Sequence, residues 1–288
     1  MKYSTFLITA IIGTFYTVYS YVLYMLKHLG FISVPKKSLQ GNLALVTGAG
    51  RGLGREISIL LAQKGCFLAC VDIDEKNVEE TVAIINRDFK LGAAKAYKGD
   101  VSSKESWAQL AKDISATQGE VDLLVNNAGI VASHNILDAS DGLIDRMVDV
   151  NLKSHFWSIR TFLPGMIKRN QGHICAISSM AAHTKAANIL RIELKQKKGN
   201  NVHLTCVHPY FIDSSPINVK HWEVKTDLGQ VSLKDVARAT VSGIQKNQFS
   251  VAYPAYIYWM VSLVKCIPQP ASDYWYESFD IDLNDKKE

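Results

Sequence analysis

The stretch Leu43–Gly54, with the sequence LALVTGAGRGLG, decides the fold of this chain. Its first residues are apolar or β-branched and end at a glycine, a pattern that predicts a short buried strand from Leu43 to Thr47. The glycines that follow allow tight backbone dihedrals and let backbone amides approach a pyrophosphate at the N-terminus of the next helix. A glycine-rich run is a weak signal by itself, because it often occurs by chance.

The next apolar run strengthens that signal. It extends from Cys66 to Val71 and ends at Asp72, about 20 residues beyond the glycines. A carboxylate at this point can accept hydrogen bonds from the ribose hydroxyls of NAD, and it would repel the 2′-phosphate of NADP. The sequence therefore predicts NAD as the coenzyme and Asp72 as its ribose ligand. Two alternatives remain: Asp72 is an ordinary turn residue at a strand end, or Asp74 shares or replaces its role.

The rest of the chain alternates short β-branched runs with amphipathic stretches. This alternation is typical of a parallel sheet with helices on both faces. We therefore expect an α/β fold with a single doubly wound parallel sheet of the Rossmann type, together with an N-terminal membrane helix. The length suits one such domain with attachments. We expect a membrane anchor over residues 1–30, the NAD-binding domain over 38–255, and an apolar segment with a charged C-terminal tail over 256–288.

Composition narrows the class of protein. The net charge of +5 is modest, so we expect no nucleic-acid partner. The cysteines show neither paired C-x-x-C spacing nor nearby histidine ligands, so we predict no metal site. They are expected to be small buried hydrophobic residues in a reducing compartment. These cysteines are Cys66, Cys70, Cys175, Cys206 and Cys266.

The N-terminus carries a candidate membrane anchor. From Tyr3 to Leu26 there are 24 residues without a charge, and as a helix they would extend roughly 36 Å, enough to cross a hydrocarbon core of about 30 Å. A cleaved signal peptide and a buried core helix are the alternatives, and the helix could also lie flat in one leaflet. Basic residues follow the run, which predicts that the folded domain faces the cytosol. They are Lys27, His28, Lys36 and Lys37, whereas only Lys2 precedes the run.

A second apolar stretch, Tyr253–Pro268, is too short to span a membrane and contains Lys265. It could contact the membrane surface, or it could form a helix that covers the core or a substrate pocket. The charged tail from Asp273 onward is expected to be poorly ordered.

Several motifs together resemble the short-chain dehydrogenase/reductase family. The family motif T-G-x-x-x-G-x-G is matched from Thr47 to Gly54, and Gly99–Val101 resembles the segment that closes over the adenine. Asn126–Gly129 resembles the family turn N-N-A-G, and Asn151 matches the asparagine that holds a water in the family's proton relay. The resemblance implies a coenzyme site formed by Thr47, Gly48, Gly50, Arg51, Gly52, Leu53, Gly54, Asp72, Asp100, Val101, Asn127, Ala128 and Gly129.

Within the family, the anchor and the residues around Val125–Val131 and Asn151–Arg160 resemble the membrane-bound retinol and 17β-hydroxysteroid dehydrogenases of the 16C group. This resemblance implies a lipophilic alcohol, ketone or aldehyde as substrate. It also implies a location at the membrane of the endoplasmic reticulum or at a lipid droplet, and pairing with a second subunit.

The catalytic half departs from the family pattern. Ser179 matches the family's catalytic serine, with Ser178 as the alternative, but no tyrosine occurs between Tyr97 and Tyr210. In the family a tyrosine followed by a lysine transfers the proton, because the ammonium lowers the pKa of the phenol. The simplest interpretation is an internal deletion, caused by splicing, by a gene-model error or by decay of a gene copy.

The shortened connection can still close. From Met180 to Asn201 there are 22 residues, and a crossover between parallel strands needs at least about 10 to 12. The lost helix commonly pairs with a partner subunit in the family, so we expect weaker stability and weaker dimerisation. Tyr210 belongs to the wrong loop to replace the missing tyrosine, and Lys195 is expected to be a solvated lysine at a helix end.

Two functions follow from these patterns. The first is a membrane-associated, NAD-dependent dehydrogenase of retinol or a hydroxysteroid, with Ser179 and Asn151 as surviving catalytic residues and with impaired or absent activity. The second is a non-catalytic homologue that binds NAD(H) or a partner protein. A chain that folds poorly and has no function as a protein is the third alternative.

Overall fold

The structure is a computed structural model that describes residues 11–16, 18–20, 22–23, 26, 32–89, 92–131, 139–179, 190–194, 199–213, 222–226, 229–256, 268–270 and 281–285. It divides into two compact units, Met1–Lys37 and Ser38–Glu288. The second unit contains the sheet and every motif of the predicted coenzyme site.

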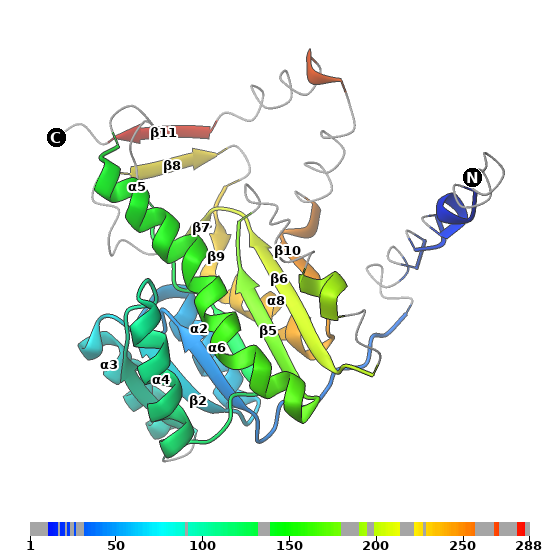
Figure 1. Cartoon of the computed structure of the whole chain (residues 1–288). Coiled ribbons are helices and arrows are strands. Elements are labelled where there is room, and N and C mark those ends of the chain that lie inside the picture. The colour runs from blue at the N-terminus through cyan, green and yellow to red at the C-terminus, as the bar shows by residue number, and fades with distance from the viewer. Residues whose placement is uncertain are drawn as a thin grey trace. The chain divides into compact units, whose positions relative to one another are not determined.

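A sheet of seven parallel strands forms the centre of the second unit, in the order β10-β6-β5-β4-β1-β2-β3 (Figure 1). The chain builds outward from β1 through β2 to β3, then returns to β4 on the other side of β1. This reversal places a switch point between the carboxyl ends of β1 and β4, where open α/β sheets bind ligands. The strands are β1 Leu43–Thr47, β2 Phe67–Asp72, β3 Ala94–Lys98, β4 Leu123–Asn126, β5 Gly172–Ile177, β6 Val202–Pro209 and β10 Ser250–Tyr253. The predicted single parallel sheet is confirmed.

Helices cover both faces of this sheet, because alternate side chains of each strand point to opposite faces. Ala44 and Val46 of β1 belong to the core shared with α2 (Gly52–Gln63), α3 (Glu75–Asp88) and α8 (Leu233–Gln245). Leu43 and Leu45 belong to the core shared with α4 (Lys104–Thr117) and α6 (Ser154–Arg169). Burial on both faces explains why the strands are continuous apolar runs.

One long helical segment leads into α6. It begins with α5 (Asp141–Val148), continues through a π-helix, η1 (Asp149–Lys153), and runs on as α6 (Figure 1). π-Helical turns are rare and frequently mark functional sites. Asn151 lies in this turn.

The crossover from β5 to β6 does close. β5 pairs in parallel with β6 over its whole length, from Gly172 opposite Val202 to Ile177 opposite Val207. Between Met180 and Lys198 the structure describes only the helical residues 190–194, of which Leu194 is buried in the core that contains α4 and α6. Residues 180–189 and 195–198 of the crossover lie outside the described residues.

Two small strand pairs complete the unit. β7 (Ile212–Asp213) pairs in parallel with β9 (Val231–Ser232), and β8 (Trp222–Thr226) pairs antiparallel with β11 (Ile281–Asp285). β11 lies within the charged tail that begins at Asp273. Its backbone groups find partners on β8, a contact between distant segments that local sequence does not encode.

The first unit contains helical residues at 11–16, 18–20, 22–23 and 26. Seven large apolar side chains there are between 49% and 73% exposed: Ile11, Ile12, Phe15, Tyr16, Val18, Tyr19 and Val22. Within the described residues, no helix meets the length and hydropathy needed to cross a membrane. Much of the uncharged run, including residues 3–10, lies outside the described part of the chain.

Four of the cysteines are buried and free, as expected for small hydrophobic residues: Cys66, Cys70, Cys175 and Cys206. Burial raises the pKa of Cys66 and of Cys70 to about 12, and the pKa of Cys206 to about 11. These thiols therefore stay protonated and unreactive near neutral pH. Cys266 lies outside the described residues.

Candidate functional site

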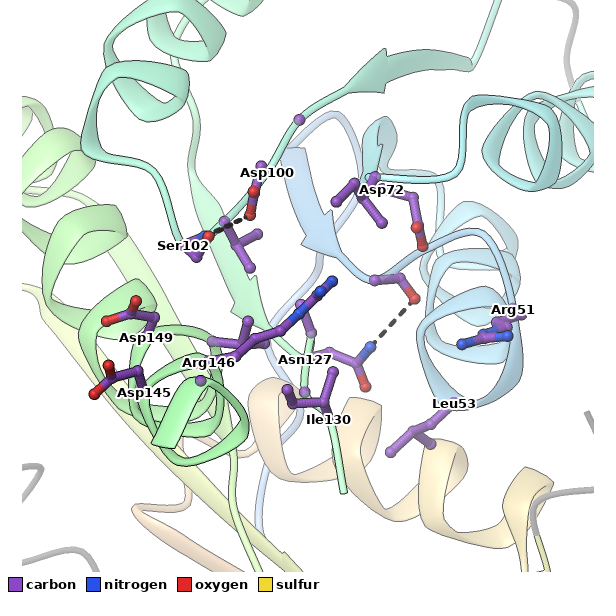
Figure 2. A pocket seen from close by; sticks show the side chains of 18 residues that line it. Arg51, Leu53, Asp72, Asp100, Ser102, Asn127, Ile130, Asp145, Arg146 and Asp149 are labelled. Atoms are coloured by element: carbon purple, nitrogen blue, oxygen red, sulfur yellow. Dashed lines mark hydrogen bonds between the residues drawn. The ribbon is translucent and has the colours of Figure 1, made fainter. Parts of the chain in front are cut away.

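A pocket of about 610 Å³ opens at the carboxyl edge of the sheet, in the size range of small-molecule sites (Figure 2). Its walls come from the ends of β1, β2, β3 and β4 and from the α5–η1 segment. Nine residues predicted for the coenzyme site line it: Gly48, Arg51, Leu53, Asp72, Asp100, Val101, Asn127, Ala128 and Gly129. The other four, Thr47, Gly50, Gly52 and Gly54, do not line the pocket, and three of them shape the turn beside it.

The glycine-rich turn depends on a close approach between backbones. Gly48 and Gly52 have φ values of 65° and 55°, in the left-handed region that favours glycine. A Cβ atom on Gly54 would lie 2.1 Å from Gly48 O and 2.6 Å from Asn127 Nδ2. Only glycine therefore lets helix α2 start this close to the end of β1.

Thr47 joins the ends of β1 and β4. Its Oγ1 accepts hydrogen bonds from the backbone N–H groups of Asn127 and Ala128, both at 3.0 Å. In return, Asn127 Nδ2 donates to Thr47 O at 2.9 Å. These bonds fix the N-N-A-G turn against the glycine-rich turn across the mouth of the pocket.

Asp72 lies at the end of β2 with its carboxylate held by two backbone amides. Oδ2 accepts from Gly50 N at 2.8 Å, and Oδ1 accepts from Asp74 N at 3.0 Å. Each carboxylate oxygen has a further lone pair, so the group can still accept from a ligand in the pocket. Asp74 instead caps α3, because its Oδ1 accepts from Asn77 N at 3.1 Å. This geometry favours Asp72 over Asp74 as the ribose ligand.

Asp100 and Val101 form another wall of the pocket. Asp100 Oδ1 accepts from the backbone N–H of Ser102 at 2.9 Å and from its hydroxyl at 2.7 Å (Figure 2). The Trp107 indole N–H donates to Val101 O at 2.9 Å from the start of α4. The predicted adenine-side segment is therefore held rigidly from both sides.

The two predicted catalytic residues lie on different elements. Asn151 in η1 locks the loop after β4, since its Oδ1 accepts from Ile130 N at 2.9 Å and its Nδ2 donates to Ile130 O at 2.8 Å. Ser179 follows β5, and the His208 Nδ1 atom lies 3.4 Å from its backbone oxygen. Ser178 N donates to Val207 O at 2.8 Å, which ties the same segment to β6. Neither serine lines the described pocket.

None of the described residues of the crossover lines the pocket. Arg191 places its guanidinium 4.3 Å from the centre of the Phe249 ring, on the sheet and away from the strand ends that form the pocket. Tyr210 is tied to the end of β10, because its backbone N–H donates to Tyr253 O at 2.9 Å. Its ring packs edge-on against Phe211. Lys195 lies outside the described residues.

The sequence patterns missed the wall formed by α5. Figure 2 shows the Arg146 side chain extending from this helix into the pocket. It makes no hydrogen bond or ion pair with any residue that the structure describes, so its guanidinium can bind a phosphate or another anion. Nothing in the sequence marks it, because one arginine on an amphipathic helix usually faces solvent. The pocket-lining residues that the patterns missed are Ile73, Ser102, Ile130, Gly142, Asp145, Arg146, Asp149 and Val150.

Comparison with known families and relatives adds to this geometry. The family described as short chain dehydrogenase matches residues 42–223. Epidermal retinol dehydrogenase 2 of Mus musculus is 32% identical over 82% of this chain and 82% of its own length. 17-beta-Hydroxysteroid dehydrogenase 13 of Homo sapiens is 31% identical over 88% of each chain. The alignment with the mouse protein has 255 positions but takes in only 82% of the 288 residues, so some positions of that relative lack a counterpart here.

Solved structures share the fold. A short-chain dehydrogenase/reductase from Burkholderia phymatum, in complex with NAD, superposes with a TM-score of 0.68 at 23% identity, covering 79% of this chain and 94% of the other. An alcohol dehydrogenase from the archaeon Thermococcus sibiricus, complexed with 5-hydroxy-NADP, gives a TM-score of 0.62 at 21% identity, covering 74% and 95%.

The close approach at Gly54 generates a stability prediction. Gly54→Ala should lower the free energy of unfolding by about 2 to 3 kcal/mol, because the new methyl group overlaps a backbone oxygen that cannot move away. Gly142→Ala is the matched control, since a Cβ atom there meets nothing within 4 Å. Thermal unfolding of the purified full chain measures both. Equal melting temperatures for the two variants would show that the turn is not as close as described.

Proposed function

The chain belongs to the short-chain dehydrogenase family, and from this premise we propose that it is a membrane-associated, NAD(H)-binding dehydrogenase homologue that has lost most or all of its catalytic activity. Its ancestral reaction is the oxidation of retinol or a hydroxysteroid, the activities that the names of its relatives give. The observation that supports the proposal is the contrast between a pocket lined by nine of the predicted coenzyme residues and a crossover without tyrosine.

The residues present fit NAD. The close approach of Gly54 to Gly48 O, which a Cβ atom would prevent, brings the N-terminus of α2 to the glycine-rich turn, and a helix N-terminus favours a pyrophosphate. Arg146 extends into the same pocket and makes no ion pair with any described residue. Asp72 would hold the ribose hydroxyls, while Asp100 and Val101 would border the adenine. The negative charge of Asp72 would disfavour the 2′-phosphate of NADP.

Oxidation of an alcohol by this chain would fail at the proton-transfer step. Bound NAD⁺ would supply the hydride acceptor for an alcohol. Ser179 would orient the substrate hydroxyl, and Asn151 would hold a water in the proton relay, but the crossover contains no tyrosine to receive the hydroxyl proton. Loss of a general acid–base group typically lowers the rate by about 10² to 10⁴. The alternative, a purely NAD(H)-binding or partner-binding homologue, is favoured by the same intact coenzyme half.

The membrane part of the proposal rests on the first residues. The run from Tyr3 to Leu26 carries no charge, and its described apolar side chains are largely exposed. Exposed apolar side chains on a helix are stabilised by a lipid environment. We therefore place an anchor at residues 1–30, at the endoplasmic reticulum or a lipid droplet. The domain over 38–255 then faces the cytosol, and residues 256–288 follow it.

The α5–α6 segment offers a surface for a second copy of the chain. Ile144, Val148, Leu152 and Phe156 recur every four residues and are between 38% and 47% exposed, so they form one apolar stripe. Two antiparallel copies of the chain would cover this stripe on each other, which favours a two-fold dimer.

We expect Phe156→Asp to convert dimers into monomers, because it places a charge in the middle of an apolar interface. Phe89→Asp, at the end of α3, is the matched control, since Phe89 is also a partly exposed phenylalanine, at 39%. Light scattering after size exclusion of the detergent-solubilised full chain measures the mass. A Phe156→Asp protein that keeps the wild-type mass would rule out this interface.

The catalytic prediction concerns alcohol oxidation. Membranes from cells that express the full chain should convert all-trans-retinol or a 17β-hydroxysteroid with NAD⁺ no faster than membranes containing Ser179→Ala or an empty vector. We expect no excess product because the crossover contains no tyrosine to accept the hydroxyl proton. Product is quantified by chromatography at expression levels matched by immunoblot. Product above both controls would mean that another group serves as the base and that the proposed loss of activity is wrong.

A further inference from the structure

Arg55 lies on α2 behind the glycine-rich turn, outside the pocket, with only 22% of its side chain exposed. Its Nε donates to Gly50 O at 3.1 Å and its Nη2 donates to the same oxygen at 2.5 Å. Two nitrogen atoms of the guanidinium thus bind the same carbonyl oxygen of the turn, that of Gly50. Two donors on one oxygen fix the position and the plane of that peptide group.

The same guanidinium holds the hydroxyl of Thr81 on α3. Arg55 Nε donates to Thr81 Oγ1 at 3.0 Å, and Thr81 Oγ1 donates in turn to Ala49 O at 2.9 Å. Thr81 is fully buried. The donor and acceptor roles are consistent, because a hydroxyl can accept one hydrogen bond and donate another.

The chain of hydrogen bonds ends at the predicted ribose ligand. Ala49 O and Gly50 N belong to one peptide group, and Gly50 N donates to Asp72 Oδ2 at 2.8 Å. The carbonyl of this peptide is held by Thr81 while its N–H holds the carboxylate. Such chains polarise one another, so each bond strengthens the next. A side chain on Gly50 would also meet Asp72, since a Cβ atom there would lie 2.9 Å from Oδ2.

We propose that Arg55 and Thr81 are positioning residues for coenzyme selection: they align the Ala49–Gly50 peptide so that its N–H fixes the Asp72 carboxylate where the 2′-substituent of the ribose must lie. This inference rests on the proposed binding of NAD(H). Neither residue touches the pocket, so both act through Asp72. A displaced carboxylate loses its bonds to the ribose of NADH and its repulsion of the 2′-phosphate of NADPH.

Thr81→Val tests the inference without changing any charge, because it replaces the hydroxyl with a methyl group of similar size. In the detergent-solubilised full chain we expect the affinity for NADH relative to NADPH to fall roughly tenfold, the size expected for losing a buried bond to a charged group. Thr81→Ser keeps the hydroxyl and should retain the wild-type ratio. Titration calorimetry with both coenzymes gives the ratio, and thermal unfolding establishes that each variant is folded.

Arg55→Gln provides a second, partly exposed site in case Thr81→Val does not fold. Positioning predicts that the NADH preference falls, whereas a purely electrostatic role predicts that it rises, since loss of a positive charge disfavours the additional phosphate of NADPH. Glu80→Gln is the control, because it removes the outer ion pair at 3.0 Å and leaves the bonds to Gly50 and Thr81. It should change the ratio by less than twofold.

A double-mutant cycle completes the test. In an Asp72→Ala background, the Arg55 and Thr81 substitutions should have no further effect on the ratio, because the carboxylate they position is absent. An unchanged ratio in folded Arg55→Gln and Thr81→Val, or an equal change without Asp72, would overturn this inference alone. A folded wild-type chain that binds neither coenzyme would overturn the proposed function and this inference with it.

Discussion

The fold depends on the contact between the ends of β1 and β4. There Thr47 Oγ1 accepts hydrogen bonds from two backbone N–H groups, and Asn127 Nδ2 donates to Thr47 O. The sheet changes direction at this point, so the loops that leave the two strands diverge and a pocket remains between them. Gly54 then lets α2 begin against the same backbone. Because these groups are held before any ligand arrives, binding would not have to order them, which favours affinity.

The described pocket and the crossover after β5 lie on separate parts of this chain. The pocket is built from the carboxyl ends of β1 to β4 and from α5, all before β5. In the family the proton-transferring pair comes from the crossover after β5, which here contains no tyrosine. The proposed loss of activity therefore leaves the walls of the pocket unchanged. In the structure β5 still pairs in parallel with β6.

Much of this architecture could be predicted from the sequence, because the decisive signals are local. A short apolar run predicts the strand β1, and the glycines from Gly48 to Gly54 predict a tight turn that leads into the helix α2. Asp72 follows at the end of the next strand. The wall contributed by Arg146 could not be predicted, since its role comes from how α5 packs above the sheet. The pairing of β8 with β11 could not be predicted either, because it joins segments more than fifty residues apart. The hydrogen bonds of Arg55 could not be predicted either, because they join α2, the glycine-rich turn and α3.

The central claim is that a complete coenzyme site survives in a chain without the family's base. Calorimetric titration of NADH into the detergent-solubilised full chain, with its folding established by thermal unfolding, tests this claim most directly. The account predicts saturable binding with one site per chain and weaker binding of NADPH. A folded chain that takes up no NADH would contradict the account, since it would mean that the glycine-rich turn and Asp72 serve the fold alone.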